Sequence, residues 1–419
     1  MAILKLSLMS LLNRKATVVL TIIAIAVSVT LLLGVDKLRD QARTGFANTI
    51  SGSDMIIGAR SGSIQLLLYS VFRIGSATNN ITWQSYLDLA ADPRVKWSIP
   101  LSMGDSHHGF RVLGTTGQYF EHYRYGGKQK LAFAEGKAFD DVFDVVIGAD
   151  VAKTLGYGIG AAVVVQHGIG AVGFVKHEDK PFRVSGILRR TGTPVDRTVH
   201  ITLKGIEAMH IDWQTGAMAT GRITSADAIR RMDLPTDTIT AILVGLKSRT
   251  TAFSFQRHVN DYKKEPLLGV LPGLALQELW SLMSTVDKTL GAIAAFVVVS
   301  GLLGMTTMIL AGLDGRRREM AILRSVGARP VHVFGLLVTE ATILTLVGSL
   351  GGVALLYLGL FLARPLAAEM LGLNLIIGLP SPRDVGILGL VVGAGFFAGL
   401  FPAFKVYRQS LADGMMTRL

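Results

Sequence analysis

Apolar residues are concentrated in four long runs, and the polar sequence between the runs differs greatly in length. The runs cover residues 16–35, 290–313, 331–362 and 385–402. Because about 20 helical residues cross the hydrocarbon core of a bilayer, each run is long enough to form a transmembrane α-helix. The pattern therefore predicts a membrane protein with four transmembrane α-helices.

The first run has an alternative interpretation as a cleaved signal sequence. Residues 24–26 read Ala-Ile-Ala, which has the small residues of a signal-peptidase site. However, the apolar stretch from 16 to 35 is longer than the roughly 7–15 residues of a signal-peptide core. We therefore expect an uncleaved span.

Residues 36–285 are predicted to form one large water-exposed α/β domain between the first and second spans. TWQSYLDLAADPRV reads as a helix with Thr82 as its N-cap, Ser85 three residues later and Pro93 after its end. Strand patterns such as DVVIGADVAKTLGY and PFRVSGIL dominate from about 125 to 215. We expect a bipartite domain whose strand-rich centre is inserted into a half formed by both flanks.

Basic residues near the spans predict the orientation of the chain. Segments 1–15, 314–330 and 403–419 together hold eleven Lys or Arg and three Asp or Glu, which is +8 of the net charge of +12. Short cytoplasmic segments carry such an excess. Both termini and 314–330 are therefore predicted to be cytoplasmic, in a multi-pass membrane protein. The domain 36–285 and a short loop at 363–384 are predicted to lie outside.

The composition narrows the class of protein further. Hydrophobic residues make up 50% of the chain and its mean hydropathy is positive, and the two together are too apolar for an ordinary soluble domain. Because the basic excess lies beside the spans, it is a topology signal, and we expect no nucleic acid among the partners. The chain has no cysteine, so the external domain is expected to fold without disulfides.

Motifs for catalysis or nucleotide binding are absent from the sequence. There is no GxxxxGK[ST] phosphate loop, no HExxH and no GxSxG. We therefore expect a non-catalytic chain that binds no cofactor itself. Eight of the nine histidines lie in 36–285, and imidazole is the commonest zinc ligand. A metal-linked role stays open, but ordinary surface histidines are the favoured interpretation.

Small residues recur at a spacing of four in the third and fourth spans. They are Gly348 and Gly352, Gly389 and Gly393, and Gly395 and Gly399. Helices in lipid associate where small side chains let their backbones approach closely. The pattern predicts tight helix packing, either within one chain or across a dimer.

Glu340 is the carboxylate that stands inside a predicted span, nine residues beyond Val331. An ionisable group at that depth is costly and is expected to face protein or water. It is either a coupling or proton-handling group or a structural hydrogen-bonding group. We favour a hydrogen bond between helices, with Thr306, Thr307 or Thr342 as its partner.

The segment RRREMAILRSVGARP, residues 316–330, lies between the second and third spans. It predicts a short helix with an apolar stripe, a C-terminal cap at Gly327 and a new helix from Pro330. One interpretation is a basic amphipathic turn on anionic headgroups. The other is a docking surface that moves with the spans. Residues 1–15 offer a second amphipathic helix, with its apolar face at Leu4, Leu8, Leu11 and Leu12.

Over nearly its whole length the chain resembles the FtsX/MacB-type permeases of ABC systems, also called mechanotransmission transporters. The most specific match is RRREMAILRSVGARPVHVFGLLVTEATILTLVGSLGG. It is similar to the family's Arg-x-x-Glu-(small)-x-x-Leu-(Arg/Lys)-x-x-Gly-Ala run, which is followed by a glutamate and a glycine-rich span. The C-terminal SLADGMMTRL is a looser form of the family's usual ending.

The resemblance implies a division of labour between chains. A separate cytoplasmic ABC ATPase would bind ATP and Mg²⁺, and two permease chains would pair as a homo- or heterodimer. MacB carries its ATPase fused at the N-terminus, so this chain resembles the stand-alone permease type. By position, the ATPase-coupling surface would consist of Arg316, Arg317, Glu319, Met320, Leu323, Arg324 and Gly327.

The cargo stays open among a lipoprotein, a peptide, a drug and a metal-linked substrate, and a periplasmic adaptor or cargo protein is a further expected partner besides membrane lipid. The apolar stretch DMIIGARSGSIQLLLYSVFRIGSATNNI is either a contact for such a partner or an ordinary buried strand and helix. The alternative function is a membrane-anchored sensor or regulator of a periplasmic enzyme, without transport.

Overall fold

A computed structural model describes residues 14–167, 182–212, 224–325, 327–371 and 377–408, together with residues 7, 9 and 11. Side chains are described over the same ranges except at 167, 314–324 and 366–371. The chain divides into two compact units. The membrane unit comprises 1–42, 284–367 and 375–419, and the α/β unit comprises 43–283 and 368–374.

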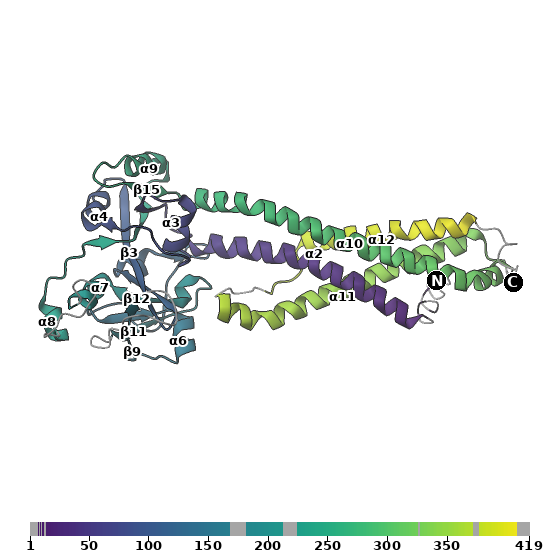
Figure 1. Cartoon of the computed structure of the whole chain (residues 1–419), viewed down its shortest axis with the longest axis horizontal. Coiled ribbons are helices and arrows are strands. Elements are labelled where there is room, and N and C mark those ends of the chain that lie inside the picture. Colours follow the sequence, from purple (N-terminus) through teal and green to yellow (C-terminus); the bar gives the residue numbers. More distant parts are fainter. Residues whose placement is uncertain are drawn as a thin grey trace. The chain divides into compact units, whose positions relative to one another are not determined.

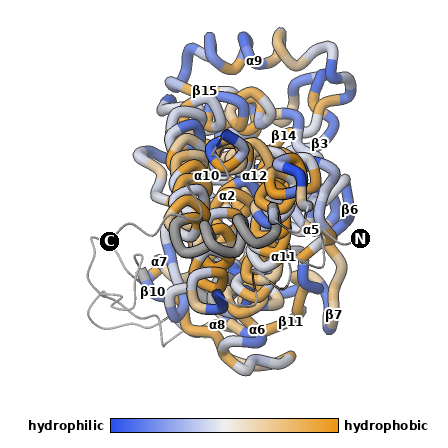
Figure 2. The backbone as a smooth tube through the Cα atoms, turned by 90° about the vertical axis from the view of Figure 1, so that its right-hand side faces the viewer, coloured by the Kyte–Doolittle hydropathy of each residue, from blue (hydrophilic) through white to orange (hydrophobic). Residues whose placement is uncertain are grey.

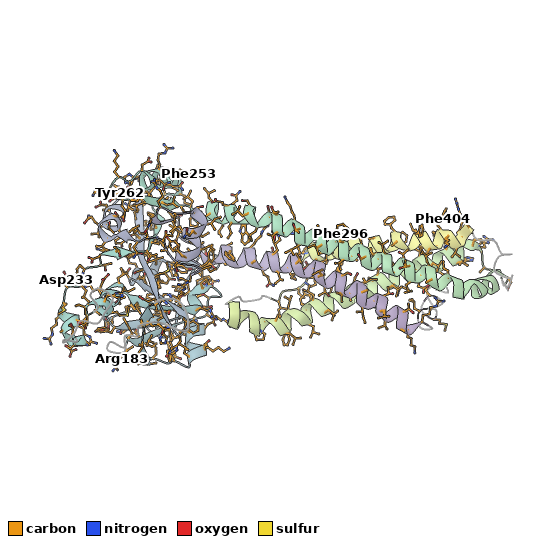
Figure 3. The ribbon with its side chains drawn as sticks, viewed as in Figure 1. Arg183, Asp233, Phe253, Tyr262, Phe296 and Phe404 are labelled. Carbon is orange, nitrogen blue, oxygen red and sulfur yellow. The ribbon has the colours of Figure 1, made fainter. Side chains whose placement is uncertain are left out.

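Four helices of the described chain are long and apolar enough to cross a membrane, as the sequence predicts. They are α2 (Lys15–Thr49), α10 (Pro272–Ser325), α11 (Pro330–Leu371) and α12 (Pro382–Arg408) (Figure 1). Figure 2 shows hydrophobic residues along these helices, and Phe296 and Phe404 point outward from them in Figure 3. Large apolar side chains on the surface of such helices are expected where lipid surrounds them.

The four helices are longer than the apolar runs that predicted them. α2 continues from 35 to 49 because this stretch contains no proline and only Gly45 as a helix breaker. α11 passes through Pro365 and ends at Leu371, so the loop predicted to begin at 363 begins later. A proline inside a helix removes one hydrogen bond and bends the helix, but does not always end it.

The α/β unit is built on a mixed sheet of eleven strands within the described residues. The strands are β1 (Met55–Ala59), β3 (Val95–His107), β4 (Phe110–Thr115), β7 (Phe133–Gly136), β8 (Asp144–Ile147), β9 (Ala162–Val163), β10 (Gln166–His167), β11 (Phe182–Leu188), β12 (Thr198–Thr202), β14 (Ala241–Leu246) and β15 (Leu267–Val270). Their order is β15-β1-β14-β3-β4-β12-β8-β11-β7, with β10 beside β3 and β9 beside β11. Two short pairs stand apart: β2 (Ile81–Thr82) with β13 (Thr238–Ile239), and β5 (Arg124–Tyr125) with β6 (Gln129–Lys130).

The long strand β3 joins the two halves of this sheet. Its first part pairs antiparallel with β14 as far as Leu101, and its second part pairs antiparallel with β4 from Ser102. In the second half, β12 runs parallel to β4 and β11 runs parallel to β8. The strand-rich half therefore begins within β3, upstream of the predicted boundary near 125, because β4 pairs with strands of that half.

Short helices cover both halves of the sheet (Figure 1). They are α3 (Ser63–Ser70), α4 (Trp83–Ala90), α5 (Gln118–His122), α6 (Ala149–Leu155), α7 (Leu203–His210), α8 (Ala226–Arg231) and α9 (Ala252–Asn260), with 3₁₀ turns at Pro194–Arg197 and Arg249–Thr251. The predicted cap of α4 is confirmed, because the Thr82 hydroxyl accepts a hydrogen bond from the Ser85 N–H. Glu265 also accepts from the Thr82 hydroxyl and N–H, at 3.1 Å each.

The apolar stretch after the first span is mostly core. All five residues of β1 are buried, and so are Leu66, Leu67 and Tyr69 of α3. Of the two interpretations, a partner contact or a buried strand and helix, the second is therefore correct for residues 55–72. The loop that follows, from Arg73 to Asn80, is partly exposed.

Candidate functional site

The basic segment 314–330 forms the turn between α10 and α11. α10 runs without a break to Ser325, Gly327 has a φ of +100°, and α11 starts at Pro330. Glycine adopts this left-handed conformation without steric cost, and proline suits the first turn of a helix. Residues 316–325 are therefore the end of α10 and not the separate short helix that was predicted. Six side chains of the predicted coupling surface lie outside the described residues: Arg316, Arg317, Glu319, Met320, Leu323 and Arg324.

The chain that leads into α2 contacts α10 and α11 near this turn. The Arg14 guanidinium donates to the carbonyl oxygen of Gly312 at 2.9 Å, and the Ser7 hydroxyl donates to that of Leu336 at 3.4 Å. Leu11 is buried. The other apolar residues predicted for this amphipathic segment, Leu4, Leu8 and Leu12, lie outside the described residues.

Glycines of α11 lie directly against α2. A Cβ atom added at Gly348 would meet the Ile25 side chain at 2.7 Å, and one added at Gly352 would meet the backbone oxygen of Ala26 at 2.7 Å. The Thr30 hydroxyl lies within hydrogen-bond distance of two carbonyl oxygens, that of Ala26 in its own helix at 2.8 Å and that of Gly352 in α11 at 2.9 Å, so its one proton is shared between the two helices. Close approach of this kind is how helices pack in lipid.

The glycines of α12 divide into two groups. A Cβ atom at Gly399 would meet the Ala341 Cβ at 2.5 Å, and one at Gly395 would clash with the Thr345 side chain, so this pair seats α12 on α11. A Cβ atom at Gly389 or Gly393 would have nothing within 4 Å among the described residues. Within the described residues, the structure thus places the second of the two predicted motifs of α12, and not the first, against another helix.

Glu340 is buried, with 2% of its surface exposed, and it takes part in a polar interaction. The predicted threonine partners do not donate to it. The hydroxyls of Thr306, Thr307 and Thr342 each donate to a carbonyl four residues earlier in their own helix, at 2.8 Å. A hydroxyl has one proton to donate, so these side chains are satisfied locally. The predicted hydrogen bonds from these three threonines are therefore wrong.

In the described part of the chain, three ion pairs join the membrane helices at the ends that lie away from the turn at 314–330. The sequence analysis did not predict them. Lys37 of α2 pairs with Asp384 of α12 at 3.2 Å, Asp36 pairs with Arg383 at 2.9 Å, and Arg39 pairs with Asp287 of α10 at 2.8 Å. A local signal for this site exists in the sequence Ser-Pro-Arg-Asp.

That local signal is a capping box at the start of α12. The Ser381 N–H donates to the Asp384 carboxylate at 2.7 Å, and the Asp384 N–H donates to the Ser381 hydroxyl at 3.2 Å. Pro382 occupies the first helical position, where its missing N–H costs nothing. The cap holds the Asp384 carboxylate in one position, where it forms the ion pair with Lys37 of α2.

Two histidines of the α/β unit are core residues, which corrects the expectation of ordinary surface histidines. His107 and His200 are 2% and 0% exposed. The His107 ring contacts the Val164 carbonyl at 2.6 Å and the Tyr157 hydroxyl at 3.1 Å, and the His200 ring contacts the Val146 carbonyl at 3.1 Å. Among the described residues, no three His, Asp or Glu side chains are grouped so that they could hold a metal ion. His177 lies outside those residues.

Burial of His200 is expected to make the α/β unit less stable in acid. Burial, together with the charge of Arg73, lowers the pKa of His200 to about 3, whereas free histidine has a pKa of about 6.5. Between these values the unfolded chain binds the proton and the folded chain does not, so stability is lost as the pH falls below about 6.5. From pH 7.5 to pH 5 this one group is expected to remove about 2 kcal/mol.

Urea unfolding of the full chain at both pH values, followed by tryptophan fluorescence, measures this loss. The variant His200→Gln should show a pH dependence smaller by that amount. His258→Gln, at a ring that is half exposed, is the matched control. Equal pH dependence in wild type and His200→Gln would contradict the assignment.

Comparison with known proteins agrees with this architecture. The model of the MacB-like periplasmic core domain matches residues 18–262, which is more than half of the chain. The model of the FtsX-like permease C-terminal domain matches residues 291–411. The first match covers α2 and most of the α/β unit, and the second covers the three remaining spans and the turn at 314–330.

Individual relatives share parts of the chain. The pyoverdine export ATP-binding/permease protein PvdT of Pseudomonas syringae pv. tomato is 22% identical over 342 residues, which are 78% of this chain and 47% of that protein. The macrolide export ATP-binding/permease protein MacB of Nitrobacter winogradskyi is 30% identical over 129 residues, 30% of this chain and 19% of that protein. The chain thus spans about half or less of the length of these curated relatives.

Among solved structures, the periplasmic region of MacB from Actinobacillus actinomycetemcomitans covers 57% of this chain and 98% of its own, with 14% identity and a TM-score of 0.36. On the two family matches, together with four spans and an α/β domain between the first two, the chain belongs to the FtsX/MacB-like family of ABC transporter permeases.

Proposed function

We propose that this permease sits in the bacterial inner membrane with both termini in the cytoplasm, and that it passes motion from a separate ATPase to its external α/β unit. The observation that carries the proposal is the turn at 314–330. It is formed by the end of a 54-residue helix, a left-handed glycine and the start of the next span. A contact at this turn acts directly on two spans.

The helix packing supports transmission of that contact. α11 is seated on α2 through Gly348 and Gly352, and α12 is seated on α11 through Gly395 and Gly399. Packed interfaces of this kind move as units and do not deform gradually. A displacement of the turn is therefore shared among the spans of the membrane unit.

The partners and direction are supported by the relatives. Those relatives are named as ATP-binding/permease proteins for export of pyoverdine and of macrolides. We accordingly propose outward movement of a substrate, ATP and Mg²⁺ bound on the ATPase, and a second permease chain that completes the transporter. This chain contributes no catalytic residue in the proposal.

Reversal of charge at the turn is the test of this proposal. The double variant Glu319→Lys, Arg324→Glu is expected to weaken ATPase association about tenfold or more, because two charged contacts become repulsive. The external unit should stay folded. The measurement is purification in mild detergent from the native host, mass spectrometry of the co-purifying proteins, and an ATPase assay on the complex.

The control is Arg408→Glu, which changes a basic residue at the end of α12, outside 316–327. This variant should keep the ATPase bound and active. If the double variant binds and stimulates the ATPase normally, the turn is not the coupling surface. If no ATPase is recovered even after crosslinking, the chain does not work with a separate motor.

A further inference from the structure

Two adjoining cavities of the α/β unit share a wall formed by Arg73 and Arg111. One cavity, of about 570 Å³, is lined mainly by polar residues of the loop 75–80. The other, of about 220 Å³, has an apolar wall that includes Phe46, Phe72 and Phe110. The two arginines therefore stand where a polar space meets an apolar one.

Arg73 occupies this position in a costly backbone conformation. Its φ is +61°, in the left-handed region that glycine normally fills after a helix. It follows α3 closely, and the N–H of Ile74 donates to the Leu68 carbonyl at 3.1 Å. Strain of this kind persists where the side chain is needed and often marks a functional position.

Neither arginine has an anionic partner in the described part of the chain. Arg73 donates to the Ser70 carbonyl, and its buried Nε has no hydrogen-bond partner among the described residues. Arg111 donates to the Gly75 carbonyl at 2.9 Å. Two guanidinium groups held beside one cavity repel each other unless an anion lies between them.

The polar groups around Arg73 do not supply that negative charge. Burial raises the pKa of Tyr119 and Tyr123, and it lowers that of His200, so all three are neutral near pH 7. Burial and the charge of Arg73 also lower the pKa of Arg111 from its usual value. These neutral groups therefore do not balance the positive charges of Arg73 and Arg111.

The apolar wall offers a surface for a nonpolar body. The Phe46 and Phe72 rings lie 4.3 Å apart between centroids, and the Arg197 guanidinium lies 5.2 Å above the Phe110 ring. Ile74, on the same wall, is 54% exposed. Pockets that combine an apolar lining with a few placed charges are typical of small-molecule sites.

We propose that these cavities bind an amphiphilic anion, whose carboxylate or phosphate contacts Arg73 and Arg111 and whose apolar body packs on Phe46, Phe72 and Phe110. The site lies wholly within the α/β unit. It needs neither the ATPase nor the coupling turn, so its test is independent of the proposed transport function.

Isothermal titration of the full chain in neutral-lipid nanodiscs tests the site, with 1-naphthyl phosphate as the probe. The probe is expected to bind saturably. Inorganic phosphate lacks the aromatic body that packs on the phenylalanines, and 1-naphthol lacks the phosphate that contacts the arginines. Each should therefore bind at least about tenfold more weakly than the probe. No saturable binding, or equal binding of inorganic phosphate, would overturn the proposal.

Variants separate loss of the site from loss of the fold. Arg73→Gly removes the cation but fits the left-handed backbone, so the α/β unit should stay folded and the probe should bind about tenfold more weakly. Arg111→Gln should have a similar effect on binding. Arg183→Gln removes an exposed arginine on β11 (Figure 3) and should leave binding unchanged. An equal loss in Arg183→Gln would show nonspecific attraction and would defeat the proposal.

Competition identifies the source of the anion. Displacement of the probe by dihexanoyl phosphatidate would assign a lipid as the natural ligand. Retention of the probe would assign a soluble amphiphile. Both results support an amphiphilic anion at Arg73 and Arg111, provided that the two arginine variants lose the probe.

Discussion

Replacement of Gly352 by leucine is expected to separate α11 from α2 and to lower the stability of the membrane unit by about 1–3 kcal/mol. A Cβ atom there would lie 2.7 Å from the Ala26 backbone oxygen and 2.7 Å from the Val29 Cβ. Neither atom is the flexible end of a side chain, so the helices themselves must move apart. The Thr30 hydroxyl would lose the Gly352 carbonyl as an acceptor and would keep the Ala26 carbonyl of its own helix, at 2.8 Å.

Reversible unfolding in mixed neutral and anionic micelles measures this loss, and Gly389→Leu is the matched control. Gly389 belongs to a motif of the same spacing, but a Cβ atom there meets nothing within 4 Å in the described chain. The control should unfold like the wild type. If both variants lose the same stability, the effect comes from the helix backbone and not from packing against α2.

The two motifs show what the sequence can and cannot predict about this membrane unit. Gly348-x-x-x-Gly352 and Gly389-x-x-x-Gly393 have the same pattern, because both put small residues on one helix face. Which helix lies opposite depends on residues more than 300 positions away, such as Ile25 and Ala26. Spacing within one helix contains no information on that partner.

Local sequence signals correctly predict short elements of the α/β unit, whereas long-range strand pairing leaves no such signal. The Thr82 cap of α4 and the strand, glycine turn and helix at 144–155 depend on neighbouring residues, and all were predictable. The division of β3 depends on β14, which lies more than 100 residues further along the chain, and on the pairing of the neighbouring strand β4 with the distant strand β12. The boundary of the strand-rich half was therefore misplaced.

The same limit hid the arginines of the cavity wall. Arg73 and Arg111 are ordinary basic residues in the sequence, and their adjacency arises only when the end of α3 is brought to β4. Even the positive φ of Arg73 has no sequence signal, because glycine is the residue that predicts such a conformation. In the structure, the left-handed backbone of Arg73 is the feature that singles this residue out.

Separation of Lys37 from Asp384 is the second large expected effect, and a double-mutant cycle isolates it. The Lys37 and Asp384 side chains are 15% and 7% exposed. Breaking a buried pair leaves one charge without compensation, so Lys37→Met and Asp384→Asn should each cost about 3 kcal/mol of stability. Asparagine keeps an oxygen that can accept from the Ser381 N–H, so the helix cap is retained.

The double variant Lys37→Met, Asp384→Asn should recover most of that loss, because no buried charge remains. Asp36 and Arg383 provide the matched control, since they join the same two helices at 2.9 Å but the Arg383 side chain is 68% exposed. Exposed pairs contribute under about 1 kcal/mol. A coupling energy for Lys37 and Asp384 no larger than that of the control pair would contradict burial as the cause. A larger coupling energy would show that the Lys37–Asp384 ion pair holds α12 against α2. This ion pair lies at the ends of the helices that are far from the turn at 314–330, where the ATPase is proposed to bind.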